Sequence, residues 1–256
     1  MRIDVLWTPA ELEGVPVQDR TGVVIDVIRS ATTVTTAIRN GARAVVPAAS
    51  TEEALRIANS IGRDQVLLAG ERHGVRIEGF DLGNSPAEFT TDVVGDRTLI
   101  MATTNGTRVL LALAAAPMVF IAAFVNLGAV ARRIVTAENP LIVCAGREGM
   151  VSVDDALCAG HLVQAWLNKR KNQSKAADLG DGAVAALSLA RDNGPVTTQF
   201  LRNTAAGRAL ERIGLGMDIE LCSKVDTIRA VPVLLDRQIV RLEPTHSWSG
   251  AATPKA

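Results

Sequence analysis

The chain has 256 residues, of which 48% are apolar, 21% charged and 3% aromatic, and its 27 lysine and arginine residues balance 27 aspartate and glutamate residues. This composition excludes a disordered chain and indicates one large domain or two small, closely packed ones. The balanced charge argues against nucleic-acid and anionic-membrane surfaces, and the lack of tyrosine against a stacking platform for bases. We therefore expect a small polar ligand.

Three cysteines, Cys144, Cys158 and Cys222, lie in apolar stretches without the spacing of metal ligands. We expect them to be buried free thiols in a reducing compartment. The first residues are too few and too polar for a signal peptide, and no apolar run approaches the roughly eighteen residues of a membrane span. The expectation is a cytoplasmic protein that forms a homo-oligomer.

Strands and helices alternate along the chain. Apolar patterns predict strands at residues 2–7, 22–27, 44–48, 66–69, 97–102, 118–122, 141–145, 228–235 and 238–242. Capping and breaking residues predict helices that end near residues 38, 61, 115, 135 and 167, and two more at 182–191 and 197–213. This order predicts an α/β protein with a layered, largely parallel or mixed sheet flanked by helices.

The order of elements also suggests a repeat. Strand, loop, helix, strand and helix follow one another from residue 22 and again from residue 97, and aligning Val45 with Val119 places Thr33 on Thr107. We interpret this as an internal duplication of a βαβα unit. Residues 1–244 are expected to form the folded domain, with a charged link at 168–175 and a flexible tail at 245–256.

Residues 68–86, with the sequence LAGERHGVRIEGFDLGNSP, place a glycine every four or five residues among charged side chains. Such glycines let the backbone turn tightly and approach a ligand closely. Further polar loops, at 26–33, 103–107 and 147–155, follow other predicted strands. Because ligands bind beyond the carboxyl ends of parallel strands, we expect these four loops to meet in one site.

Two of these loops lead straight into helices, so backbone amides beside hydroxyl groups could cradle a phosphate. Serine and threonine are also ordinary helix caps, so one such loop alone is not specific. The candidate substrate-binding residues are Thr32, Thr33, Asn84, Ser85, Thr103, Thr104, Asn105 and Thr107.

The same loops carry carboxylates. They belong to Asp26, Glu71, Glu78, Asp81, Asp154 and Asp155. Such hard oxygen ligands suit Mg²⁺, which takes one or two protein carboxylates, whereas scattered histidines argue against zinc. Asp26 interrupts a buried strand, where a carboxylate needs a partner or a metal, while Asp154 and Asp155 also fit the first turn of a helix.

Arginines complete the predicted site. Arg29, Arg72 and Arg147 can each hold an anion through two parallel hydrogen bonds, which suggests a ligand with more than one anionic group. His73 is interpreted as a bystander, because a single histidine among charges and glycines has no assigned partner. Together these residues fit metal-assisted hydrolysis of a phosphate ester.

Four motifs in sequence make the interpretation more specific. They are VVIDVIRSATTV, LAGERHGVRIEGFDLGNSPAEF, TTNGTR, and CAGREG followed by DDALCAG. In this order and across nearly the whole chain, they resemble the family of 2-phosphosulfolactate phosphatases. The resemblance implies that family's α/β fold and Mg²⁺-dependent hydrolysis of 2-phosphosulfolactate to sulfolactate and phosphate, a step towards coenzyme M. Ser30 departs from the alanine expected in the family's Arg-Ala-Thr run.

The resulting hypothesis assigns catalysis to four residues, which are Asp26, Arg29, Glu71 and Arg72. Mg²⁺ would be held by Asp26 and Glu71 with Asp81 or Asp155, and Arg147 would hold a carboxylate or sulfonate. Either a metal-bound water or Asp26 attacks phosphorus, and the missing DxDxT signature favours water.

Two other functions are weighed against this one. A non-catalytic protein could bind a small phosphorylated metabolite with the same loops. A kinase or nucleotide-dependent enzyme is disfavoured, because neither GxxxxGK[ST] nor GxGxxG occurs.

Overall fold

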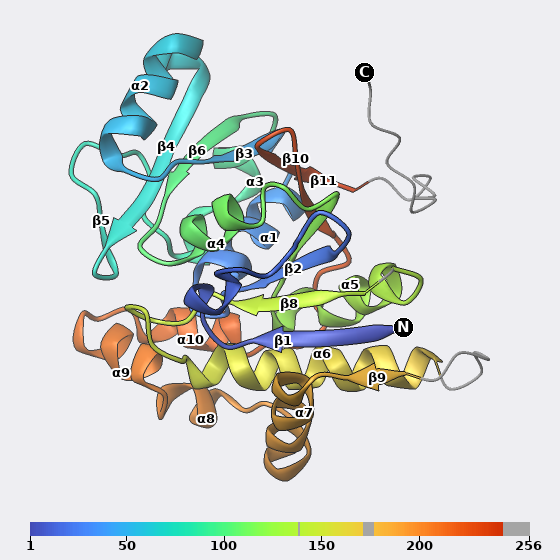
Figure 1. Ribbon diagram of the computed structural model, residues 1–256. Coiled ribbons are helices and arrows are strands. Elements are labelled where there is room, and N and C mark those ends of the chain that lie inside the picture. Colours follow the sequence, from blue (N-terminus) through green and yellow to red (C-terminus); the bar gives the residue numbers. More distant parts are fainter. Residues whose placement is uncertain (138, 171–176, 243–256) are drawn as a thin grey trace, which may run out of the picture.

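The computed structural model describes residues 1–137, 139–170 and 177–242. Within these residues one sheet of eleven strands runs through the molecule, with helices on both sides (Figure 1). The strands are β1 (Arg2–Leu6), β2 (Thr21–Ile25), β3 (Ala44–Pro47), β4 (Val66–Arg72), β5 (Val75–Arg76), β6 (Thr98–Ala102), β7 (Met118–Ala122), β8 (Leu141–Cys144), β9 (Asp178–Leu179), β10 (Pro232–Leu235) and β11 (Gln238–Arg241).

The helices lie between these strands and after β9. They are α1 (Ser30–Arg39), α2 (Thr51–Ile61), α3 (Thr91–Val94), α4 (Gly106–Ala112), α5 (Leu127–Ile134), α6 (Val153–Arg170), α7 (Asp181–Asn193), α8 (Thr198–Arg202), α9 (Ala205–Arg212) and α10 (Gly216–Cys222). Short 3-10 turns occur at Pro9–Leu12, Arg63–Gln65, Pro86–Glu88 and Phe124–Asn126. No described helix has the length and apolar character needed to cross a membrane.

Apart from the short edge strand β5, which pairs antiparallel with β4, the sheet consists of two parallel blocks joined by an antiparallel hairpin. The strand order is β5-β4-β6-β3-β11-β10-β7-β2-β8-β1-β9. Strand β10 pairs antiparallel with β7, placing Val233 opposite Phe120, and β11 pairs antiparallel with β3, placing Ile239 opposite Val45. Because β10 and β11 are also antiparallel to each other, the two blocks run in opposite senses. The α/β prediction with a mixed, mostly parallel sheet is confirmed.

The apolar run of β2 is buried on both faces, as its sequence predicts. Successive strand residues point to opposite faces of a sheet. Val23 and Ile25 accordingly pack in the core that includes Trp166 of α6, whereas Val24 packs in the core that includes Val109 of α4. The ends of the strand are therefore fixed, and the residues that follow it are held at the rim of the sheet.

The predicted helix at 197–213 is two helices, α8 and α9, with α10 following. Thr204 makes the break, because its hydroxyl accepts a hydrogen bond from the Gly207 amide at 3.0 Å and donates one to the Leu201 carbonyl at 2.8 Å. A β-carbon on Gly207 would lie 2.0 Å from the Leu201 oxygen, so the two helices pack closely.

Two residues at helix starts do not cap the helix with their side chains. Asn126 precedes α5, but its side chain turns back, accepting from the Ala123 amide at 2.9 Å and donating to the Ile121 carbonyl at 3.0 Å. Asp155, in the first turn of α6, accepts hydrogen bonds from two amides outside its helix that are described below. Asp155 therefore has a partner far away in the sequence, whereas these two partners of Asn126 are local.

The two copies of the proposed duplication each span both blocks of the sheet. The first copy contains β2 and β3, and the second contains β6 and β7. Strands β2 and β7 lie in one block and β3 and β6 in the other, so each copy would contribute one strand to each block. The duplication and the single-domain boundary stay predictions. The tail at 245–256 and most of the charged link lie outside the described residues.

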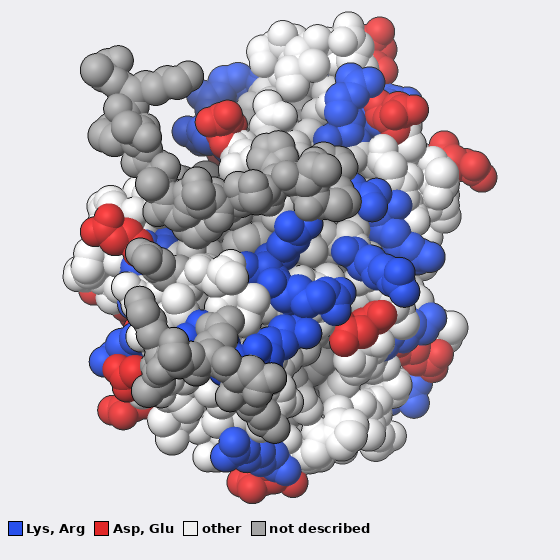
Figure 2. Space-filling model, turned by 90° about the vertical axis from the view of Figure 1, so that its right-hand side faces the viewer, with Lys and Arg blue, Asp and Glu red and all other residues white. Residues whose placement is uncertain are grey.

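The three cysteines are buried free thiols, as predicted. Surface charge is unevenly distributed on the face shown in Figure 2, where basic side chains gather near the middle and acidic ones lie mostly around them. A groove in the described structure is lined by arginines from α5, β11 and the segment before β10, namely Arg132, Arg133, Arg229 and Arg241. The zero net charge therefore does not mean an even distribution.

Candidate active site

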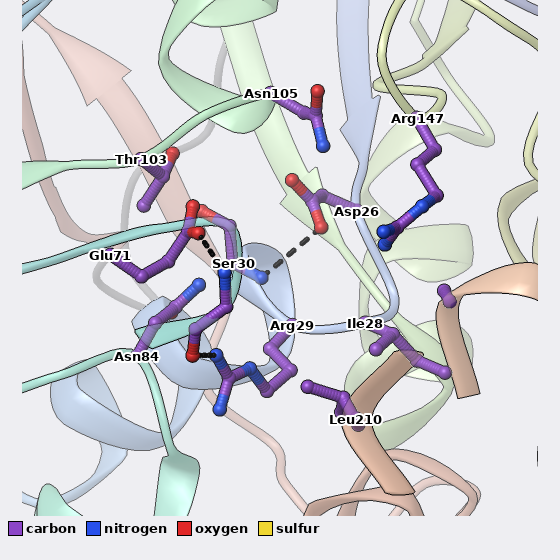
Figure 3. A pocket seen from close by; sticks show the side chains of 12 residues that line it. Asp26, Ile28, Arg29, Ser30, Glu71, Asn84, Thr103, Asn105, Arg147 and Leu210 are labelled. Atoms are coloured by element: carbon purple, nitrogen blue, oxygen red, sulfur yellow. Dashed lines mark hydrogen bonds between the residues drawn. The ribbon is translucent and has the colours of Figure 1, made fainter. Parts of the chain in front are cut away.

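Four loops meet in one small pocket, next to the ends of β2, β4, β6 and β8 (Figure 3). Helix α9 closes one side. The lining residues are Asp26, Ile28, Arg29, Ser30, Glu71, Gly74, Asn84, Thr103, Asn105, Arg147, Ala206 and Leu210. The structure thus brings together all four polar loops that the sequence singles out.

Asp26 follows the last residue of β2 and is 6% exposed. One of its oxygens accepts a hydrogen bond from the Ser30 amide at 3.2 Å (Figure 3). Burial raises the pKa of Asp26 to about 7, and the nearby charges of Asp154 and Glu71 add to this effect, while Ser30 and Arg29 oppose it. The pocket therefore holds a carboxylate whose negative charge is poorly compensated by its protein surroundings.

Glu71, at the end of β4, is buried and joins two loops. One oxygen accepts from the Gly74 amide at 2.7 Å and the other from the Thr104 amide at 2.8 Å. Strands β4 and β6 approach closely at Gly70, where a β-carbon would lie 2.2 Å from the Ala102 carbonyl oxygen. This close approach places Glu71 against the loop after β6.

Arg29 lies in the pocket wall with its guanidinium engaged by the protein. It forms a buried ion pair with Asp218 of α10 at 2.7 Å and donates to the Gly74 carbonyl at 2.7 Å. Ser85 donates its hydroxyl to the same carboxylate at 2.5 Å. The sequence did not point to Asp218, because an acidic residue in the first turn of a helix is common on electrostatic grounds alone.

The loop after β6 supplies hydroxyl and amide groups. The hydroxyls of Thr103 and Thr107 lie 3.2 Å apart, and the Asn105 side-chain oxygen accepts from the Glu148 amide at 3.3 Å. Two buried oxygens nearby, Oδ1 of Asn84 and Oγ1 of Thr104, have no hydrogen-bond partner among the described residues. Because buried polar atoms are normally paired, these two are suited to contact a bound molecule.

Thr32 and Thr33 are buried in the first turn of α1 and do not line the pocket. Their hydroxyls donate to the Val27 carbonyl at 2.8 Å and to the Asn84 carbonyl at 3.0 Å. The structure therefore places them as supports that fix the start of α1 and the backbone of Asn84.

Two of the four expected metal ligands lie away from the pocket lining. Asp81 forms two bonds of 2.9 Å with Arg63 and accepts the Leu68 amide at 2.7 Å. Asp155 accepts the Val27 amide at 2.8 Å and the Gly146 amide at 3.0 Å. Each carboxylate thus has both oxygens bonded to protein donors, as Glu71 does, and their place outside the pocket lining is what separates them from Glu71. In addition, burial raises the pKa of Asp155 well above its usual value.

Arg72 also lies outside the pocket lining, and its guanidinium donates to the Glu71 carbonyl at 2.9 Å. Arg147 does line the pocket. Its side chain is 35% exposed and approaches Glu148 at 3.4 Å. Of the three predicted anion-binding arginines, Arg147 is the one in the lining without a buried ion pair.

A second pocket adjoins the first and shares its boundary residues, which are Glu71, Gly74, Asn105, Arg147 and Leu210. His73, for which the sequence predicts no role, lines this second pocket with Ile213 of the segment after α9. The apolar wall from α9 was not predicted, because its residues look like the buried face of an ordinary amphipathic helix.

The described residues contain no group of three or more His, Cys, Asp and Glu side chains arranged to hold a metal. Asp26 and Glu71 are the carboxylates in the first pocket. Two carboxylates in one pocket match the usual protein share of a Mg²⁺ shell, which water and substrate oxygens complete. The donor set therefore fits Mg²⁺ through Asp26 and Glu71.

The fold and the site define an α/β protein with a small polar pocket beyond its strand ends. The chain matches the family model of 2-phosphosulpholactate phosphatase over residues 6–237. It is 36% identical over 241 residues to a probable 2-phosphosulfolactate phosphatase of Clostridium acetobutylicum, covering 94% of this chain and 100% of that protein. It is also 36% identical over 234 residues to one of Thermotoga maritima, covering 91% and 96%. The chain belongs to the 2-phosphosulfolactate phosphatase family, which confirms the resemblance of its motifs.

Proposed function

We propose that this chain is a Mg²⁺-dependent phosphatase, a phosphoric monoester hydrolase that converts 2-phosphosulfolactate, or a similar small phosphorylated hydroxy acid, to the hydroxy acid and phosphate. Family membership supports the reaction class. The observation that carries the proposal is one pocket in which Asp26 and Glu71 lie with Asn84, Asn105 and Arg147. In this proposal the product sulfolactate leads towards coenzyme M, and a cytoplasmic homo-oligomer stays the expected state.

Asp26 and Glu71 would hold Mg²⁺. When bound, the ion supplies positive charge beside the phosphate oxygens. The raised pKa of Asp26, caused first by burial and then by the charges of Asp154 and Glu71, supports this assignment. A carboxylate with too little compensating charge is a favourable place for a cation.

The pocket also provides groups for the rest of the substrate. Arg147 stands at the boundary between the two pockets, so it can bind a carboxylate or sulfonate while the phosphate lies near Asp26. The hydroxyl of Thr103 and the amide of Asn105 line the phosphate side. The hydroxyl of the product, or a water beside the substrate, could donate to the unpaired oxygen of Asn84.

In the reaction that we propose, water attacks phosphorus and the bond from phosphorus to the hydroxy-acid oxygen breaks. The attacking water releases its proton to solvent and the leaving oxygen takes one up, so Asp26 can stay an ionised ligand of Mg²⁺ throughout. The leaving oxygen ends as the hydroxyl of the product. The alternative route, through an acyl phosphate on Asp26, predicts a labelled protein when the reaction is quenched in acid with radioactive substrate.

The test is phosphate release from a panel of phosphorylated hydroxy acids with and without EDTA. We expect turnover of 2-phosphosulfolactate, a lower kcat/KM for phospholactate, which lacks the sulfonate, and loss of activity in EDTA that Mg²⁺ restores. Tight binding of these compounds without phosphate release would instead support the non-catalytic binding protein. Full activity in EDTA would contradict the metal assignment.

A further inference from the structure

Helices α8–α10 are connected to the carboxylates of the pocket by a continuous chain of short polar contacts. It begins at Asp218 on α10, which is 2% exposed. Asp218 accepts the Ser85 hydroxyl at 2.5 Å and pairs with Arg29 at 2.7 Å. Arg29 donates to the Gly74 carbonyl at 2.7 Å. This chain crosses three segments that are far apart in sequence.

The chain of contacts continues through Gly74 to Glu71. While the Gly74 carbonyl accepts from Arg29, its amide donates to one oxygen of Glu71 at 2.7 Å. The Thr104 amide holds the other oxygen at 2.8 Å. The Gly74 turn packs closely against the segment after α9, because a β-carbon on Gly74 would lie 2.8 Å from Ile213. A shift of the Arg29 guanidinium would therefore move the turn that orients Glu71.

Asp218 also acts on the other carboxylate. Arg29 directly precedes Ser30, whose amide donates to Asp26 at 3.2 Å. Fixing the side chain of Arg29 thus fixes the backbone beside that donor. The Asp218 side chain does not line the pocket. The pocket-lining residue that Asp218 contacts is Arg29, through the buried ion pair, while Ser85 holds the other oxygen of Asp218.

We infer that Asp218 is a positioning residue for the proposed phosphatase reaction: through Arg29 it sets the geometry of both Glu71 and Asp26. The inference rests on the proposed function. Buried ion pairs contribute little net stability compared with apolar packing, so their value often lies in the geometry that they impose. An error of about 1 Å in the placement of reacting groups can reduce a rate by about a hundredfold.

The test uses Asp218→Asn, which keeps the shape of the side chain and removes its charge. We expect kcat to fall by about ten- to a hundredfold with KM changed less than about threefold, because positioning acts on the transition state. Hydrogen exchange of the peptides covering residues 70–76 and 103–107 should speed up, since the Gly74 and Thr104 amides both bond to Glu71. The matched control is Glu220→Gln on the same helix, which breaks an exposed pair with Arg202 at 3.0 Å; its kcat and its exchange in both peptides should match wild type.

A double-mutant cycle separates positioning from general loss of stability. Arg29→Lys and Asp218→Asn break the same link, so the double variant should be little worse than the poorer single variant. Ser85→Ala, which leaves the ion pair intact, should show a smaller loss and serves if Asp218→Asn does not fold. Additive losses in the cycle, or wild-type kcat and exchange in folded Asp218→Asn, would overturn the inference. So would wild-type kcat and exchange in Ser85→Ala, if Asp218→Asn does not fold. A wild-type protein that releases no phosphate would overturn the proposed function instead, and exchange would still test the positioning.

Discussion

The carboxylate of Asp26 occupies the space next to Gly106, where a side chain would otherwise be. A β-carbon built on Gly106 would lie 2.9 Å from Asp26 Oδ2 and 2.7 Å from the Ser30 hydroxyl. Separations under 3.0 Å at a β-carbon force a shift. The absence of a side chain at the start of α4 therefore allows the loops after β2 and β6 to meet.

Gly106→Ala should impair catalysis more than folding. The added methyl must displace Asp26 or Ser30, so we expect kcat to fall at least about tenfold, with a small change in melting temperature. Gly216→Ala, at the first residue of α10, is the control, because its nearest neighbour would be Glu211 at 3.6 Å. Steady-state kinetics and thermal unfolding of both variants measure the effect. An unchanged kcat in Gly106→Ala would mean that catalysis does not depend on the observed position of the Asp26 carboxylate.

Asp26→Asn should lower phosphate release by at least about a hundredfold while the circular dichroism spectrum stays that of the wild type. The substitution removes a negative charge that is proposed to hold Mg²⁺. Asp178→Asn in β9 is the control, because that carboxylate is mostly exposed and pairs loosely with Arg2 at 3.8 Å. A near-normal rate in Asp26→Asn would remove Asp26 from the mechanism.

Stability in EDTA should fall as the pH rises from about 4 to about 7. Burial raises the pKa of Asp26 from 3.8 to about 7, so the folded protein keeps a proton that the unfolded chain loses at lower pH. The stabilisation from that proton is present at low pH and is lost as the pH passes through the folded pKa. Burial shifts the pKa values of Asp154 and Asp155 upward as well.

The measurement is the melting temperature between pH 5 and pH 8 without divalent cations. We expect a decrease of several degrees in the wild type, a shallower decrease in Asp26→Asn, and recovery of the wild type at pH 8 when Mg²⁺ is added. A melting temperature that rises across this range would contradict the assigned sign.

Asp155→Asn should destabilise the fold without changing the Mg²⁺ requirement. The Asp155 carboxylate accepts hydrogen bonds from the backbone amides of Val27 and Gly146. In the variant, the side-chain NH₂ group of asparagine would face one of these two backbone N–H donors and could not accept from it. Leaving one of them unpaired lowers the free energy of unfolding by about 1–3 kcal/mol. Urea unfolding measures this loss, and the Mg²⁺ concentration for half-maximal phosphate release measures the metal requirement.

Glu71→Gln provides the comparison for that experiment, because Glu71 is a proposed metal ligand. We expect this variant to need at least about tenfold more Mg²⁺ than wild type. If Asp155→Asn raised the Mg²⁺ requirement to the same degree, Asp155 would be a metal ligand, as its sequence context predicts. Its hydrogen bonds to the Val27 and Gly146 amides would then not be its whole function.

Arg147→Ala should raise KM by about ten- to a hundredfold for substrates with a sulfonate or carboxylate, because it removes a charge-assisted contact. KM for p-nitrophenyl phosphate, which has no second anionic group, should change little. Arg76→Ala in the exposed strand β5 is the control. Equal losses for both kinds of substrate would place Arg147 at the phosphate instead.

The sequence predicts the order of elements and the four loops well, because both depend on local patterns. Asp26 stands out as a charge in an apolar strand, and Glu71 as a charge among glycines. Asp81 was assigned to a metal because composition cannot show that Arg63 takes both of its oxygens. The same limit applies to Asp155, whose donors are separated from it by up to 128 residues.

Asp218 was not found for a related reason. Its partner Arg29 lies 189 residues away, so no local pattern connects them. The order of elements along the chain likewise does not predict where the β10–β11 hairpin joins the sheet. A hairpin at the end of a sequence of alternating strands and helices can join either edge of the sheet, and only side-chain packing between distant strands places it in the centre.

That central hairpin has a consequence for biosynthesis. Residues 232–241 join two half-sheets whose other strands all come earlier in the chain. Until residues 232–241 leave the ribosome, β3 and β7 are unpaired edge strands that can pair with another nascent chain. We therefore expect chaperone dependence to be greatest late in translation, and fragments that stop before Pro232 to aggregate.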